Sequence, residues 1–81
     1  MFRYTSANVN YQIKALEREL ARMSGYVHHY SYNPTRNHRD WVIDIYLPFG
    51  DSFHIVAHGP REAYHMIRAV RWALAVSHKD S

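Results

Sequence analysis

Alternation of apolar and polar residues over Trp41–Leu47 is the feature that most constrains the fold of this chain. The apolar residues that recur at every second position are Trp41, Ile43, Ile45 and Leu47. Because successive side chains of a strand point to opposite faces, this segment predicts a strand with one face in the core. Asp44 lies on the second face, which indicates that this face meets solvent.

Two further segments are predicted to form strands beside it. Residues Tyr26–Tyr32 and Ser52–Ala57 both alternate, and the first places aromatic side chains together on one face. These side chains are Tyr26, His28, Tyr30 and Tyr32. Residues Pro48–Asp51 predict a turn, and the polar, basic run Asn33–Asp40 predicts a loop. Short links favour antiparallel hairpins.

An amphipathic helix is predicted before the strands, over Ala7–Ser24. Ser6 stands where an N-cap is expected, and Gly25 stands where the residue that follows a helix C-cap is expected. The apolar residues recur at helical spacing and are Val9, Ile13, Leu16, Leu20 and Met23. The same spacing is also that of a coiled-coil seam, so a homodimer is an alternative use of this stripe.

A second helix is predicted from Gly59-Pro60 to about Ser77, because proline is suited to the first helical position. Its predicted core face contains Ala63, Met66, Ile67, Val70, Ala73 and Leu74. The opposite side carries Arg61, His65, Arg68 and Trp72, flanked by Tyr64 and Arg71.

These segments predict one α+β domain over residues 1–81, in the order α-β-β-β-α. Two helices with apolar stripes are most simply buried on one face of a three-stranded antiparallel sheet. The chain contains no cysteine, no secretory hydrophobic segment and no apolar run near the ~18 residues that a membrane span needs. We therefore expect a cytoplasmic protein with no membrane partner.

Catalytic motifs are scarce in this chain. Its seven histidines include no pair with the spacing of zinc proteases, and no glycine-rich phosphate loop is present. Asp44 with His28 or His54 is a possible acid–base pair, although an exposed cross-strand pair is the more common outcome. We expect no enzyme activity, no metal and no cofactor.

Arginine and aromatic residues form the candidate binding surfaces, and the net charge is +3. Such residues are typical of protein interfaces, and they also suit phosphate contacts and base stacking. The candidates outside the second helix are Tyr30, Tyr32, Arg36, His38 and Arg39. The candidates on the second helix are Arg61, Tyr64, His65, Arg68, Arg71 and Trp72.

The predicted element order resembles that of double-stranded-RNA-binding domains. In this resemblance, NPTRNHRD, which precedes the strand WVIDIYL, corresponds to the loop between the first two strands. GPREAYHMIR corresponds to the start of the last helix. It implies that His38 enters a minor groove and that Arg61, His65 and Arg68 contact phosphates. The lysine-rich KKxAK run and the loop Gly-Pro of that family are absent here, and Glu62 lies among the corresponding positions.

The segments ARMSGYVHHYSY and REAYHMIRAVRWAL are similar to those of small phage accessory proteins, including the anti-CRISPR class. This resemblance implies a non-catalytic inhibitor that occludes a host defence protein in the host cytoplasm. A protein partner is therefore the leading prediction, and nucleic-acid binding is the alternative.

Overall fold

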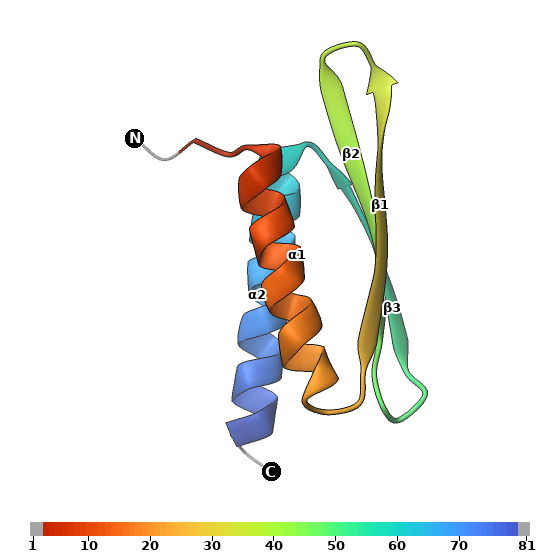
Figure 1. Cartoon of the computed structure of the whole chain (residues 1–81), viewed down its shortest axis with the longest axis vertical. Helices are drawn as coiled ribbons and strands as arrows, with labels where there is room; N and C mark the ends of the chain where they lie inside the picture. Colours follow the sequence, from red (N-terminus) through yellow and green to blue (C-terminus); the bar gives the residue numbers. More distant parts are fainter. Residues whose placement is uncertain (1–2, 80–81) are drawn as a thin grey trace.

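The computed structural model describes residues 3–79, with side chains to residue 76, as a three-stranded sheet and two helices. The elements are α1 (Ser6–Ala21), β1 (Tyr26–Thr35), β2 (His38–Tyr46), β3 (Ser52–His58) and α2 (Pro60–Lys79). Both helices lie against one face of the sheet, and the other face is left uncovered (Figure 1). The predicted α+β class and element order are thus confirmed. Over residues 3–79, neither helix is long and apolar enough to cross a membrane.

The sheet has the order β1-β2-β3, and both strand pairs are antiparallel. Ile43 at the centre of β2 pairs with His29 of β1 and Ile55 of β3. On the opposite face, Asp44 pairs with His28 and His54. This register keeps the alternation of all three strands in phase, so the apolar residues of β2 and β3 share the face that the helices cover.

The core lies between β2 and the two helices. The buried apolar side chains in this cluster are Val9, Ile13, Leu16, Leu20, Trp41, Ile43, Ile45, Ala57, Ala63 and Ile67. They come from the two helical stripes and the apolar face of β2, together with Ala57 from β3. Ala73, which was predicted on the core face of α2, is exposed instead. The middle strand therefore supplies the surface on which both helices are held.

The hairpin between β1 and β2 differs from the sequence prediction, which placed a loop over Asn33–Asp40. In the structure β1 continues to Thr35 and β2 begins at His38, so only Arg36 and Asn37 connect them. The hairpin extends past the ends of the helices (Figure 1). Residues 33–37 are exposed on both faces, and this largely polar segment lacks the alternation that identifies a half-buried strand.

The start of α1 is also one residue earlier than predicted, because Thr5 and not Ser6 is the N-cap. The Thr5 hydroxyl accepts the Asn8 backbone N–H at 3.2 Å, and the Asn8 side-chain oxygen accepts the Thr5 N–H at 3.0 Å. These reciprocal bonds form a capping box, which satisfies two backbone donors at the helix start.

Gly25 does not end α1 in the way that the sequence suggests. The left-handed backbone conformation belongs to Ser24, whose φ is 65°, and Gly25 donates its N–H to the Leu20 carbonyl at 2.8 Å. Glycine is required at 25 for another reason, since a Cβ there would lie 2.7 Å from the Tyr46 carbonyl oxygen. The close approach of the chain to the end of β2 selects this glycine.

Substituting Ser24→Gly should stabilise the protein. A side chain in the left-handed region is strained, and glycine relieves this strain at some cost in unfolded-chain entropy, so we expect the unfolding free energy to rise by roughly 0.5 kcal/mol. Urea unfolding followed by circular dichroism measures the change, and Ser24→Ala is the control that should not stabilise. A lower stability for Ser24→Gly would place the left-handed residue elsewhere.

Candidate functional site

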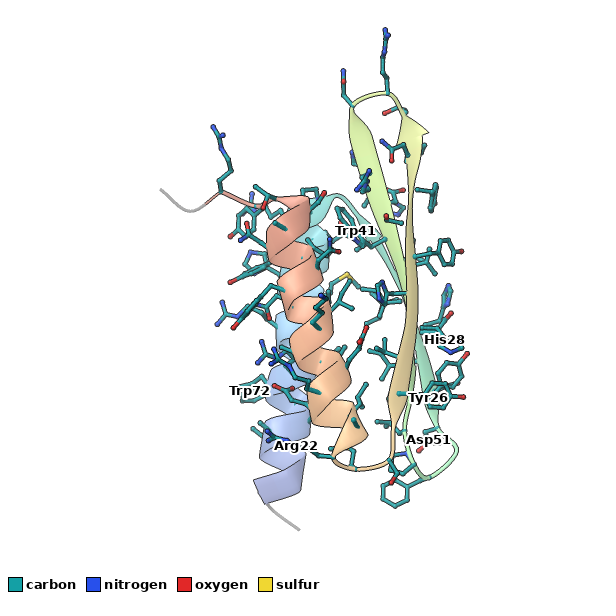
Figure 2. The ribbon with its side chains drawn as sticks, in the orientation of Figure 1. Arg22, Tyr26, His28, Trp41, Asp51 and Trp72 are labelled. Atoms are coloured by element: carbon teal, nitrogen blue, oxygen red, sulfur yellow. The ribbon has the colours of Figure 1, made fainter. Side chains whose placement is uncertain are left out.

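Aromatic side chains cover the face of the sheet that the helices leave open. We call this surface the tyrosine face and define it by Tyr26, His28, Tyr30, Tyr32, Val42, Asp44, Tyr46, Ser52, His54 and Val56. Tyr26, Tyr30 and Tyr32 are 53%, 58% and 43% exposed. Figure 2 shows Tyr26 and His28 on the side of the sheet away from the helices.

The rings of the tyrosine face are packed against one another. Tyr26 stacks on Tyr46 with a centroid separation of 4.6 Å and an angle of 15° between the planes. His28 lies against both rings, at 5.3 Å from Tyr26 and 5.6 Å from Tyr46. Val42 is only 5% exposed, so side chains of the neighbouring strands lie over it. The face is therefore an ordered surface before any partner binds.

The acid–base pair considered from sequence forms between Asp44 and His54. Nδ1 of His54 lies 2.5 Å from Oδ1 of Asp44, and both side chains remain open to solvent. His28 is the residue opposite Asp44 on the other strand. Cross-strand register makes such a pair wherever opposite partners share a face, so the contact by itself indicates a sheet pairing.

A second carboxylate–histidine group lies at the other end of β2, around Asp40. Asp40 is 4% exposed, and its Oδ2 accepts a hydrogen bond from Nδ1 of His58 at 3.0 Å. Its Oδ1 lies 2.7 Å from Nε2 of His38 at an angle that does not suit a hydrogen bond, so that contact is an ion pair. His38, which the sequence favoured as a partner contact, is thus paired within the chain, although its side chain is still 43% exposed.

Electrostatics at this group shift two pKa values. Burial raises the pKa of the Asp40 carboxyl, but the His58 hydrogen bond and the charges of His38 and His58 outweigh burial and lower it overall. The hydrogen bond to Asp40 and its negative charge raise the pKa of His58. The pair therefore favours its ionised form in the folded state.

The outer side of α2 carries a second exposed surface, as predicted. Arg61, His65, Arg68 and Trp72 are exposed there, and Trp72 is 70% exposed. The Arg68 guanidinium lies 5.6 Å from the centre of the Tyr64 ring. Tyr4, which the sequence did not single out, contacts the Tyr64 ring edge-on and places its hydroxyl 3.0 Å from Nε2 of His65.

Arg71 joins the two helices. Its Nε donates to Oε1 of Glu19 at 2.9 Å, and its Nη1 donates to Oε1 of Gln12 at 2.6 Å. Gln12 is buried, so the guanidinium satisfies a polar group in the interior. Arg71 was predicted as a partner contact, and the structure shows that its donors are engaged within the chain.

The predicted binding residues fall on two sides of the molecule. Tyr30 and Tyr32 belong to the tyrosine face, whereas Trp72 lies on the helix side (Figure 2). Arg36 lies in the hairpin turn, and Arg39 donates from Nε to the Asn33 side-chain oxygen at 3.3 Å. A single partner of ordinary size would contact one of these sides.

The two residues of the buried carboxylate–histidine pair, Asp40 and His58, were not identified from the sequence. Asp40 was assigned to a loop, although its even spacing from Asp44 places both on one strand face. His58 was placed after the last strand, whereas β3 includes it. Within residues 3–79, no group of three or more His, Asp or Glu side chains converges as metal ligands would.

Substituting Arg71→Lys should lower the unfolding free energy by about 0.5–1.5 kcal/mol, because one ammonium cannot reproduce a planar fork between Glu19 and Gln12. Urea unfolding measures the change. Arg68→Lys, one turn earlier on the exposed side of α2, is the matched control and should stay within about 0.5 kcal/mol of the original protein. Equal effects of the two substitutions would contradict the assigned role of Arg71.

The Asp40–His58 pair predicts a defined pH dependence of stability. His58, with a raised pKa, stabilises the fold fully below about pH 6.5, and this contribution is lost as the pH rises through its folded value. Asp40, with a lowered pKa, contributes above about pH 4, and this is lost as the pH falls through its folded value.

The stability difference between the original protein and Asp40→Asn should therefore be largest between about pH 4 and pH 6.5 and should shrink on both sides. Urea unfolding at a series of pH values measures it. Asp51→Asn, in the exposed turn before β3, is the control and should not reproduce this profile. A difference that is constant with pH would rule out the Asp40–His58 linkage.

Comparison of this chain with protein-family models, with curated proteins and with solved structures found no match. A function has therefore to be inferred from the two exposed surfaces and from the groups that support them. Of these surfaces, the tyrosine face is the more aromatic.

Proposed function

We propose that this protein is a non-enzymatic binding module that docks a protein partner on its tyrosine face. The observation that carries the proposal is that one whole face of the sheet is uncovered and carries exposed rings already packed together. Exposed aromatic patches that are contiguous are characteristic of interaction sites.

The chemistry of the face suits a protein surface. Tyrosine offers a large apolar contact together with a hydroxyl that forms hydrogen bonds, and it is enriched in interface hot spots. Rings that are already stacked lose little freedom on binding, which lowers the entropic cost of association. Asp44 and His54 add polar groups among the rings, which a partner can match for specificity.

The narrower proposal is that the partner belongs to a host defence complex and that binding occludes it. It rests on the resemblance of two segments to small phage accessory proteins of the anti-CRISPR class. A compact module that acts by steric occlusion needs an ordered contact surface and no reaction pocket, which is consistent with the tyrosine face.

Substitutions on the tyrosine face should weaken partner capture. The tagged protein is used to recover binders from bacterial lysate, the recovered proteins are identified by mass spectrometry, and affinity for the purified binder is then measured. Tyr30→Ala on β1 and Val56→Arg on β3 should each weaken binding at least about tenfold, because both lie in the proposed contact.

Trp72→Ser is the matched control, since it removes an exposed aromatic ring on the other side of the molecule. Its affinity should stay close to that of the original protein. Loss of binding with Trp72→Ser but not with Tyr30→Ala would assign the contact to α2 and overturn the proposal.

Binding to duplex RNA is the second candidate, and it is favoured by the exposed row of Arg61, His65 and Arg68 on α2. Double-stranded-RNA-binding domains use the loop between the first two strands to enter a groove. Here that loop is only a two-residue turn at Arg36, and His38 is paired with Asp40. Gel retardation with duplex RNA at low and high salt decides this candidate, because phosphate contacts are salt-sensitive.

A further inference from the structure

β1 lies at an edge of the sheet, and its outer backbone groups have no strand beside them in the part of the chain described here. Unpaired edges are usually protected by charged side chains or by a short strand. β1 is ten residues long, and its sequence YVHHYSYNPT contains no Asp, Glu, Lys or Arg. This edge is therefore open to pairing with another strand.

A groove borders the start of β1 on the helix side of the sheet. It has a volume of about 410 Å³ and lies between α1 and the start of β1, lined by Glu17, Ala21 and residues 25–29. Tyr26 and His28 of the tyrosine face also border this groove.

Pro34 limits which part of the edge can pair. Proline has no N–H to donate, and the register of β1 against β2 shifts between Tyr32 and Thr35. The regular part of the strand is Tyr26–Tyr32. The residue at the centre of this segment is His29.

The regular segment is nearly symmetric about His29. In an antiparallel pair of two copies centred there, Tyr26 would face Tyr32 of the second copy, and His28 would face Tyr30. Aromatic residues would meet aromatic residues on the open face, which is a favourable class of cross-strand pair. On the helix side of the sheet, Val27 would lie opposite Ser31 of the second copy.

We infer that two copies of this chain associate through β1, antiparallel and centred on His29, to form one six-stranded sheet. The pairing is isologous, so it closes at a dimer, whereas joining β1 to the β3 edge of another copy would form an open chain of molecules. The inference does not depend on the proposed function.

The charges near the centre are compatible with this pairing. Nε2 of His29 lies 3.2 Å from Oε1 of Glu17 in the same chain. The axis of the dimer would therefore bring together two histidine–glutamate pairs rather than two unpartnered carboxylates. The remaining residues of the paired segment carry neither Lys, Arg, Asp nor Glu.

Light scattering after size-exclusion chromatography of the full chain should give twice the chain mass of 9.6 kDa. Cysteine variants then locate the contact, because the chain has no cysteine of its own. His29→Cys should form a disulfide-linked dimer on mild oxidation, since facing residues of an antiparallel pair are about 4.5–5.5 Å apart at Cα, within disulfide range.

Ser31→Cys is the matched control. In the proposed register the two substituted residues would be four residues apart along the strands, roughly 13 Å. This variant by itself should therefore form no disulfide-linked dimer. A mixture of Ser31→Cys and Val27→Cys chains should crosslink to each other, because these positions face one another in this register. Circular dichroism checks that each variant is folded.

A monomer mass for the original protein would overturn the inference. Crosslinking of Ser31→Cys as fast as His29→Cys would also overturn it, because the contact would then have another register. Neither result bears on capture of a partner by the tyrosine face, because Val56 lies on β3, outside the proposed dimer contact, and tests that face by affinity.

Discussion

Burial of two helical stripes on the same face of one sheet is the constraint on which the rest of this structure depends. Ile43 and Ile45 of β2 meet Leu16 and Ile67 from the two helices in one core. A chain of 81 residues has few apolar side chains to bury, so a small domain gathers them in a single layer. The opposite face of the sheet is then left without a cover of its own.

The open face is stabilised by side chains rather than by a second layer. Stacked tyrosines lie over β1 and β2, and histidine–carboxylate pairs join β2 to β3 at Asp40 and Asp44. The two pairs have different surroundings, since Asp40 is almost fully buried while the Asp44–His54 pair is open to solvent. The first is suited to holding the sheet together, and the second is free to meet a partner.

The proposed dimer and the proposed binding face are compatible with each other. Pairing at the β1 edge would leave the tyrosine faces of both copies open and would place them on the same side of a continuous sheet. Two copies of a binding site on one surface can engage a partner with two contacts, which raises the effective affinity without new interactions. The exposed side of α2 would remain on the opposite side of the assembly.

Periodicity made the fold readable from sequence alone. A periodic pattern of apolar residues indicates that one side of a strand or helix is buried. Such patterns occur in Trp41–Leu47, with a period of two, and in Val9, Ile13 and Leu16, with helical spacing, and they defined the layers of the fold. The same alternation also placed Tyr26, His28, Tyr30 and Tyr32 together on the open face. This part of the candidate site was therefore predictable as a set.

Where burial is not one-sided, the sequence left the outcome to the tertiary structure. The β1–β2 hairpin extends beyond the helices, so its polar residues carried no strand signal. Arg71 is bound to partners 52 and 59 residues away, and such distant contacts have no local pattern. Gly25 depends on both the sequence and the tertiary structure. The glycine is visible in the sequence, but the Tyr46 carbonyl that requires it comes close only in the folded chain.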